Sequence, residues 1–260
     1  MNVKKVIKLI KEKLGPYEEE DKNNNGLIFG DGKKKIKEIY FCWRLTLEML
    51  ENLSLNDSVL IICHEPIIYD IKQSLIPVSN YNLNHNEKKL NLIYSSKINI
   101  ARFHLSLDSS PYGTKSTLIT RLDLVEKKKF DYFSICELKQ SLKTKDFVKK
   151  IKNTLEVPFV KVVGNINKDL KKILVVPGGG AKKEFISFAL NKGCDAILSG
   201  DSYSESEYFA YENKLLIIDP GHQFLEIPGI ENFANMIKRD MLNKKIKVGF
   251  INNKQIYNFY

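Results

Sequence analysis

Hydrophobic residues along the chain follow two spacings, one typical of helices and one typical of buried strands. Over residues 3–14 they recur every three or four positions, which predicts an amphipathic helix that ends at Gly15. Residues 36–42 and 58–63 form short apolar runs rich in β-forming residues, so we expect buried strands there. A helix is expected between them, over residues 45–53.

The same two spacings continue to the end of the sequence. Further strands are expected at 98–107, 132–137, 159–163, 173–176, 196–198, 215–218 and 246–250. Further helices are expected at 114–124, 145–154, 182–191, 204–211 and 230–242, with a turn at 127–130 and a polar, asparagine-rich loop at 79–92. Strands that alternate with helices predict a layered α/β/α fold with a mainly parallel or mixed sheet. Ligands bind such sheets at the carboxyl ends of the strands.

The charge balance is basic, and it admits two explanations. Lys and Arg outnumber Asp and Glu by 41 to 31, giving a net charge of +10. That excess attracts anionic partners such as nucleotides or nucleic acid. The lysines are scattered in short runs, however, and many of these fall on the polar face of an expected helix or in a turn, which favours a solvated surface. No apolar stretch reaches the roughly 20 residues of a membrane helix, and the N-terminus has no signal-peptide core. We therefore expect a soluble, cytoplasmic protein with no membrane partner.

The four cysteines do not form a metal or redox motif. Cys42, Cys63, Cys136 and Cys194 all lie in apolar contexts, and no two of them form a CxxC pair. We expect buried, reduced thiols. The sequence also contains no GxSxG motif, so it gives no indication of a serine hydrolase triad.

The distribution of histidines is the most informative chemical feature. Three of the four histidines lie at or just after an expected strand with a carboxylate within four residues, in the pairs His64 with Glu65, His104 with Asp108, and His222 with Glu226. Histidine and carboxylates are common ligands of divalent metal ions. The fourth, His85, falls in the polar stretch 79–92 and is left out of the site.

Each pair taken alone also has an ordinary structural explanation. His64 fits the end of a strand beside a surface glutamate, and Asp108 fits a turn or a helix cap. His222 fits the start of a helix beside a solvated Glu226. Three such pairs in one chain with so few histidines favour a polynuclear metal site over three coincidences.

Two glycine-containing turns near the end of the sequence leave alternatives open. Gly178, Gly179 and Gly180 follow an expected strand and precede a helix, an arrangement that suits either a phosphate-binding turn or a turn without ligand. Asp201, after Ser199 and Gly200, is expected either to support a metal ligand or to cap a helix.

These motifs, in this order, resemble a known family over nearly the whole chain. The matching segments are 23–30, His64-Glu65-Pro66, 104–108 with Gly113, the glycine turn, Gly193-Cys194-Asp195, Ser199-Gly200-Asp201 and 219–226. The sequence resembles the Nif-three-like family, whose members are often labelled GTP cyclohydrolase I type 2 homologs. The segment 219–226 is the most specific match.

The resemblance implies a dinuclear metal site and a fold around it. Its ligands would be His64, Glu65, Asp108, His222 and Glu226, with Glu226 as the bridging carboxylate between two divalent ions. It also leads us to expect two intertwined, similar α/β domains around a central metal cleft, formed by residues 1–125 with 226–260 and by 126–225.

Two residues depart from the family pattern in the same direction. Glu65 stands where the family has the second histidine of its HHP motif, and Glu205 stands near another family histidine. If Glu65 binds metal, a carboxylate in place of an imidazole favours Mn, Mg or Fe over Zn. If it does not, we expect one of the two ions to be lost or weakly bound.

The leading functional hypothesis is a dinuclear metal-dependent hydrolase that acts on a nucleotide or another small phosphate-bearing substrate. Glu65, His104 or Glu205 would transfer protons. The alternative is a non-enzymatic metal-binding adaptor or a nucleic-acid-associated ring, since the family resemblance implies a homohexamer.

Overall fold

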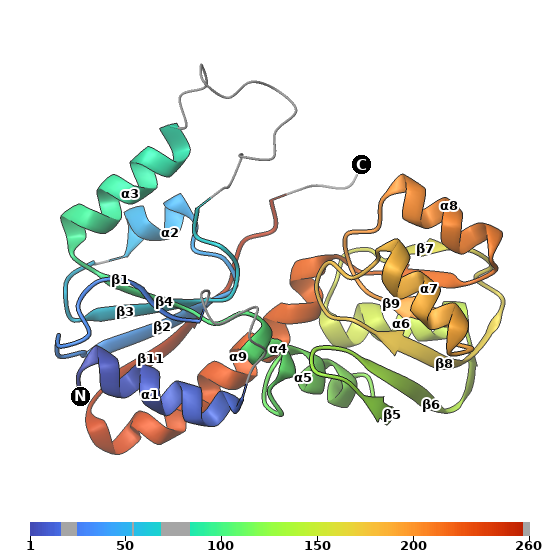
Figure 1. Cartoon of the computed structure of the whole chain (residues 1–260), viewed down its shortest axis with the longest axis horizontal. Coiled ribbons are helices and arrows are strands. Elements are labelled where there is room, and N and C mark those ends of the chain that lie inside the picture. The colour runs from blue at the N-terminus through green and yellow to red at the C-terminus, as the bar shows by residue number, and fades with distance from the viewer. Residues whose placement is uncertain (17–24, 54, 69–83, 257–260) are drawn as a thin grey trace. The chain divides into compact units, whose positions relative to one another are not determined.

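The computed structural model describes residues 1–16, 25–53, 55–68 and 84–256 and consists of two compact units (Figure 1). The first unit is Met1–His104 together with Ala234–Tyr260, and the second is Leu105–Phe233. The sequence-based division placed its boundaries after residues 125 and 225, whereas the contacts divide the chain after His104 and Phe233.

The first unit is built on a five-stranded mixed sheet with the strand order β1-β4-β3-β2-β11. Its strands are β1 (Gly26–Phe29), β2 (Glu38–Cys42), β3 (Val59–Cys63), β4 (Asn99–Arg102) and β11 (Lys247–Ile251). Strand β1 is antiparallel to β4, and the other neighbouring strands are parallel. The parallel strands therefore all end at the same edge, where the residues that follow them gather.

Helices cover both faces of this sheet. Figure 1 shows α2 (Leu47–Asn52) and α3 (Asn84–Ser96) over one face, where Leu50 and Ile93 join a buried cluster with β3. The other face carries α1 (Val3–Leu14) and the last turns of α9 (His222–Met241), which are joined by the Lys13–Asp240 ion pair of 3.2 Å. The short 3-10 helix η3 (Leu242–Lys244) leads from α9 to β11.

The opening helix has the ends and the buried face that its sequence predicts. Asn2 caps α1 by accepting a hydrogen bond from the Lys5 backbone N–H, and Gly15 ends it at a φ of 83°. The buried positions are Val3, Val6, Ile10 and Leu14. These four side chains form one stripe because a helix repeats every ~3.6 residues.

The second unit contains a six-stranded mixed sheet with the strand order β5-β6-β8-β9-β10-β7. Its strands are β5 (Leu124–Lys129), β6 (Ser134–Lys143), β7 (Lys161–Val163), β8 (Asp169–Val175), β9 (Ala196–Leu198) and β10 (Leu216–Asp219). Strands β8, β9 and β10 are mutually parallel, and the other neighbouring pairs are antiparallel.

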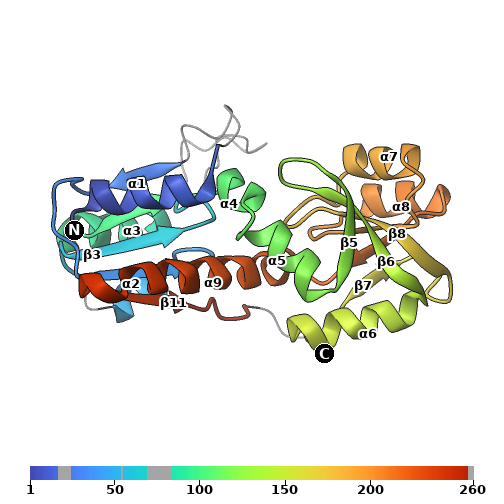
Figure 2. The same cartoon turned by 90° about the horizontal axis from the view of Figure 1, so that it is seen from below.

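Both faces of the second sheet are also buried under helices (Figure 2). Ile173 and Val175 of β8 pack with α5 (Thr114–Arg121) and α6 (Thr144–Leu155), and Leu174 packs with α7 (Lys183–Asn191) and α8 (Ser204–Glu212). Alternate residues of a central strand are thus apolar on both sides. The mixed α/β fold expected from the sequence is confirmed.

The expected loop at 79–92 is wrong where the structure describes it, because helix α3 begins at Asn84. Its buried positions include Asn86, Lys89 and Ile93, spaced three and four residues apart. Two of these three side chains are polar, so the helical stripe cannot be recognised from hydrophobicity. Residues 79–83 of the expected loop lie outside the described residues.

Two further expected elements also need correction. The strand expected over 98–107 ends at Arg102, and Asp108 lies on the short helix α4 (Leu105–Ser109). The turn expected at 127–130 is mostly strand β5, which pairs with β6. The lysine run there lies on an exposed edge strand, where charged side chains are common.

The final helix starts much earlier than residue 230, because it continues through Pro228. Proline inside a helix removes a hydrogen bond and costs about 3 kcal/mol or more. Burial of Leu225, Ile230 and Phe233, each no more than 1% exposed, offsets this cost. As a result, His222 and Glu226 lie on one helix, one turn apart. Among the described residues, no helix is long and apolar enough to cross a membrane.

Candidate metal centre

At the carboxyl edge of the first sheet, residues of metal-ligand type follow two neighbouring parallel strands. His64 and Glu65 come directly after β3, and His104 follows β4. A ligand atom of His64 lies within 4.8 Å of one on His104 and of one on Glu65. The His64 and His104 ring centroids are also 4.8 Å apart. Three of the predicted site residues are therefore brought together within this unit.

The His64 ring is buried, and the neighbouring strand fixes its orientation. Its Nδ1 lies 3.0 Å from the Phe103 carbonyl oxygen, and a carbonyl only accepts, so Nδ1 carries the proton. Arg102 donates from Nε to the His64 carbonyl oxygen at 3.0 Å. In the neutral ring this arrangement makes Nε2 the nitrogen that offers a lone pair. The local structure therefore presents His64 in a ligand-competent tautomer.

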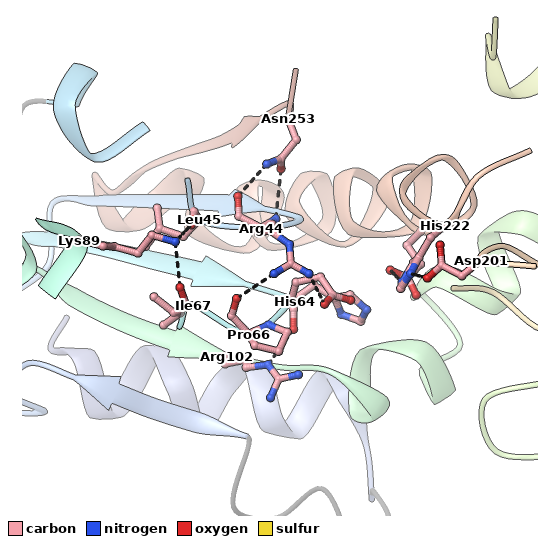
Figure 3. Close-up of polar contacts among 12 residues, drawn as sticks. Arg44, Leu45, His64, Pro66, Ile67, Lys89, Arg102, Asp201, His222 and Asn253 are labelled. Atoms are coloured by element: carbon pink, nitrogen blue, oxygen red, sulfur yellow. Dashed lines mark hydrogen bonds and ion pairs between the residues drawn. The ribbon is translucent and has the colours of Figure 1, made fainter. Parts of the chain in front are cut away.

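The Glu65 carboxylate is paired with a cation from the segment that follows β2, the strand next to β3. Arg44, two residues after β2 and labelled in Figure 3, places a guanidinium nitrogen 2.8 Å from Glu65 Oε2. Asn253 fixes the Arg44 backbone from both sides, accepting from its N–H at 3.2 Å and donating to its carbonyl at 2.7 Å. The Glu65 side chain is only 8% exposed, so this pair is mostly withdrawn from water.

Lys89 of α3 ties together the loops that carry these residues. Its ammonium group donates to the carbonyl oxygens of Leu45 at 3.0 Å and Ile67 at 2.9 Å (Figure 3). Burial lowers the pKa of Lys89, and the nearby Arg44 lowers it further. The lysine therefore links the segments after β2 and β3 from the helix that covers them.

At the carboxyl edge of the second sheet, three parallel strands bring together a second set. The turn Gly178–Gly180 follows β8, Asp201 follows β9, and His222 follows β10. His222 Nδ1 lies 2.7 Å from Asp201 Oδ2 (Figure 3), and His222 Nε2 lies 3.0 Å from Glu226 Oε2. Nδ1 donates to Asp201, which leaves Nε2 directed at the carboxylate of Glu226. Asp201 therefore orients His222, and the alternative that it caps a helix is wrong, because α8 has Tyr203 as its N-cap.

The glycines of this unit approach the same side chains very closely. A Cβ on Gly178 would lie 2.2 Å from Glu226 Oε1, and one on Gly179 would lie 2.8 Å from Asp201 Oδ2. A Cβ on Gly200 would lie 2.5 Å from the His222 backbone nitrogen. Gly178 also has a φ of 77°. Glycine is required at these positions because the backbone itself forms the wall beside the histidine and the carboxylates.

A hydrogen-bonded network holds the two loops that carry Asp201 and His222. Ser202 donates to Asp219 Oδ2 from its backbone N–H at 3.0 Å and from its hydroxyl group at 2.8 Å. Lys161 pairs with Glu207 at 2.7 Å and lies 3.7 Å from Asp219. The hydrogen bond from Lys161 lowers the pKa of Glu207. Asp201 itself has a φ of 58°, a conformation that Asp and Asn tolerate better than most residues.

Asp108 is buried at the end of the second unit's first helix and receives a short hydrogen bond. The Thr114 hydroxyl donates to Asp108 Oδ1 at 2.6 Å. A Cβ on Gly229 would lie 2.3 Å from Thr114 Cα, so α9 packs tightly on the start of α5. The contact fixes Thr114, and through it the Asp108 carboxylate.

Glu205, the other predicted catalytic residue, has a different environment. Its carboxylate pairs with Lys183 at 2.7 Å, and its side chain is 68% exposed. Among the described residues, Glu205 forms no hydrogen bond or ion pair with His222 or Asp201, in contrast to the buried Glu226. The structure therefore places Glu205 on the surface of α8.

Several supporting residues could not be recognised from the sequence alone. Arg44 and Thr114 become recognisable only through their contacts with Glu65 and Asp108. Asn25 accepts a hydrogen bond from the His104 backbone N–H at 3.2 Å. The glycines could be recognised in the sequence, because a run of glycines directly after a strand indicates that the backbone approaches another group closely. The sequence did not show which side chains they approach.

The donor set is chemically suited to divalent metal ions. It consists of imidazole nitrogens and carboxylate oxygens, most of them buried, in an arrangement typical of borderline and hard ions. In both His64 and His222, Nδ1 donates to an oxygen, so that Nε2 is the nitrogen left to bind a metal ion. Metal-bound histidines commonly have this arrangement. Side chains of metal-ligand type thus gather in each unit, and the residues fit a metal ion.

Comparison with protein families decides the relationship suggested by the motifs. The family described as Duf34/NIF3 (NGG1p interacting factor 3) matches residues 1–256. The chain belongs to the Duf34/NIF3 family. The resemblance inferred from the sequence motifs is therefore confirmed.

Individual relatives agree with this assignment. A Buchnera aphidicola subsp. Baizongia pistaciae protein called GTP cyclohydrolase 1 type 2 homolog is 28% identical over 257 residues, covering 97% of this chain and 98% of that protein. A Bacillus cereus protein related to NIF3 has the same fold, with a TM-score of 0.81 at 17% identity over 100% of this chain and 99% of that one. Reduced HcgD from Methanocaldococcus jannaschii gives a TM-score of 0.76 at 23% identity, covering 96% and 97% of the two chains.

Proposed function

We propose that this Duf34/NIF3 protein is a dinuclear metal-dependent hydrolase that acts on a nucleotide or another small phosphate-bearing substrate. The metal ligands in this proposal are His64, Glu65, Asp108, His222 and Glu226. The observation that carries it is the hydrogen-bond pattern that His64 and His222 share, each within its own unit. Each ring donates from Nδ1 to an oxygen and so keeps Nε2 for a ligand.

The chemistry assigned to the ions is that of two-metal hydrolases, where bound divalent ions lower the pKa of a water molecule and polarise a phosphoryl oxygen or ring carbon. The protein's own residues set the geometry. Asp201 and the Phe103 carbonyl orient the two histidines, and Thr114 orients Asp108. Position 65 has a glutamate where the family pattern has a histidine. A carboxylate oxygen is a harder ligand than an imidazole nitrogen, so we expect Mn, Fe or Mg in preference to Zn.

His104 is the residue to which we assign proton transfer. Its ring lies beside that of His64, and Asn25 fixes its backbone N–H. A general acid or base must reach the reacting atoms. In this proposal the substrate binds at the metal ions, so His104, as a neighbour of the ligand His64, lies close to it. Glu205 stays a prediction of the family pattern, because its carboxylate pairs with Lys183 on the surface.

The experiment is a hydrolysis assay on protein freed of metal with a chelator and then reloaded with Mn. GTP is the first substrate to test, because relatives carry the name GTP cyclohydrolase 1 type 2 homolog, followed by other nucleotides. We expect turnover only in the reloaded protein, and loss of at least about 100-fold in His64→Ala and Asp108→Asn. Asp146→Asn, an exposed carboxylate on α6, is the matched control.

The opposite outcome is equally informative. If turnover is absent with every nucleotide, or is the same with and without metal, the hydrolase proposal is wrong. The non-enzymatic alternative then predicts binding of nucleic acid that weakens steeply with salt, because the net charge of +10 is the feature that would drive it.

A further inference from the structure

A pocket in the first unit lies at the opposite end of β4 from His104. Its volume is about 180 Å³, and its lining combines the end of β1, the loop that follows it, the last turn of α3 and the two residues just before β4. The lining residues are Phe29, Gly30, Asp31, Lys34, Ile93, Tyr94, Lys97 and Ile98. Ile98 precedes the four-residue strand β4, whereas His104 follows it. Four strand residues span roughly 13 Å, so the pocket is separate from the metal ligands.

The size of the pocket limits its occupant. Drug-sized ligands fill pockets of roughly 300–1,000 Å³, whereas an apolar cavity of about 150 Å³ holds a benzene ring. With about 180 Å³, this pocket has room for one ring and little more.

The lining favours an aromatic ring. Phe29, Ile93 and Ile98 supply apolar surface, and Phe29 packs edge-on against Tyr94, with ring centroids 5.9 Å apart and an interplanar angle of 83°. Tyr94 is 66% exposed at the pocket, a large aromatic surface to leave in water. Aromatic side chains with one exposed face commonly serve as contact surfaces for planar ligands.

Charge at the rim favours an anionic group on that ring. Lys34 pairs with Asp57 at 2.9 Å, and Lys97 also lines the pocket, where its charge helps to lower the pKa of Asp57. Within the part of the chain that is described, the Lys97 ammonium group has neither an ion pair nor a hydrogen bond. Asp31 is the one carboxylate in the lining, but exposed Lys33 and Lys35 flank the same loop. A lysine ammonium group without an ion pair, beside an apolar, ring-sized pocket, is complementary to an aromatic anion.

The walls of the pocket are fixed by a buried side chain. Asn99, fully buried, accepts from the Asp31 backbone N–H at 2.9 Å and donates to the carbonyl oxygens of Asp57 at 2.9 Å and Val59 at 3.1 Å. A Cβ on Gly30 would lie 2.4 Å from Asn99 Oδ1, so the loop approaches as closely as glycine allows. The pocket is therefore largely preformed, which reduces the entropy lost on binding.

We infer that this pocket is a second ligand site, which binds a planar aromatic ring carrying one anionic group, with the ring against Tyr94 and Phe29 and the anion at Lys97. The same chemistry occurs in a free small metabolite and in a single pyrimidine nucleotide of an RNA strand. The site is independent of the metal ligands and of the proposed hydrolase activity.

The test uses 4-hydroxybenzoate and its neutral analogue 4-hydroxybenzamide as probes, with ligand-observed NMR on chelator-treated protein. A ligand this small is expected to bind with a Kd on the order of 1 mM. We expect the anion to bind about fivefold more tightly than the amide, because an exposed ion pair contributes up to ~1 kcal/mol. Uridine 5′-monophosphate and a short polyuridylate strand distinguish the two sources: a nucleic-acid ligand predicts tighter binding of the strand.

Substitutions at two exposed residues of the pocket test where the probes bind. Lys97→Asn is chosen because asparagine tolerates the φ of 55° at this position. It should abolish the preference for the anion and leave amide binding unchanged. Tyr94→Ala should weaken both probes about fivefold. Tyr211→Ala on α8 and Lys88→Asn on α3 are the matched exposed controls. Equal binding of all four variants to both probes, or no binding to the wild-type protein, would overturn the inference.

Discussion

Asp201 accepts a hydrogen bond of 2.7 Å from Nδ1 of His222 and thereby directs the opposite nitrogen of the ring toward Glu226. The two residues come from the ends of neighbouring parallel strands, β9 and β10. The sheet therefore brings the carboxylate and the imidazole together, and the carboxylate sets the tautomer of the histidine.

Removing this carboxylate should weaken metal binding without removing a ligand. We expect Asp201→Ala to raise the metal dissociation constant about 10–100-fold, the usual effect of losing such a partner. Asp201→Asn keeps an oxygen acceptor and suits the φ of 58°, so its loss should be smaller. Competition with a chromophoric chelator measures both. Unchanged affinity in Asp201→Ala would mean that His222 does not bind metal through Nε2.

A methyl group at Gly178 should disrupt the same centre sterically. In Gly178→Ala the added Cβ would meet Glu226 Oε1 at 2.2 Å, and φ is 77°. Gly193→Ala is the matched control, because φ is 64° there and nothing lies within 4 Å of the added atom. Both variants should lose about 1 kcal/mol of unfolding free energy through backbone strain. Only Gly178→Ala should also lose bound metal, as measured by elemental analysis; equal metal content in the two would contradict the geometry.

The Arg44–Glu65 pair predicts a stability effect that depends on metal. Arg44→Met leaves the nearly buried Glu65 carboxylate without its cation, so metal-free protein should lose about 1–3 kcal/mol of unfolding free energy. A bound ion would compensate the charge, so the loss should shrink when metal is present. Urea unfolding with chelator and with Mn measures the difference. Arg121→Met, which removes the exposed 3.8 Å contact with Glu231, should cost less than about 1 kcal/mol in both conditions.

Glu207 supplies a prediction about pH. Its pKa is lowered from the usual 4.5, chiefly by the hydrogen bond from Lys161. A carboxyl whose pKa is lower in the folded state stabilises the fold above its usual pKa, and this contribution disappears as the pH falls through the lowered value. Glu207→Gln should therefore be less stable than wild type at pH 7, by under about 1 kcal/mol because the pair is partly exposed. The two proteins should converge once the pH has fallen below the lowered pKa of Glu207. A constant difference across this range would contradict the assignment.

Much of this architecture was predictable because strand ends leave a local signature. The apolar run of β3 followed by His64 was recognisable, and so was the α/β alternation of the second unit. The long helix α9 was not, because Pro228 reads as a helix breaker and only the buried contacts of its neighbours offset that cost. Helix α3 was hidden because its buried face includes Asn86 and Lys89.

The predicted ligands had a signal in the sequence, whereas most of the residues that orient them did not. A histidine followed by a carboxylate at a strand end is a pattern along the chain. Arg44 and Glu65, by contrast, meet only because β2 and β3 are parallel neighbours. Thr114 is known to support Asp108 only from their hydrogen bond. Contacts across strands and helices depend on register, which the sequence does not state.

The measurement that tests the central claim most directly is the metal content per chain of purified protein, by elemental mass spectrometry, for wild type and His222→Ala. The wild-type chain should hold about two divalent ions, as in two-metal hydrolases, and His222→Ala should lose at least one of them. A wild-type chain that holds none, after purification without chelator and after metal has been added back, would contradict the account.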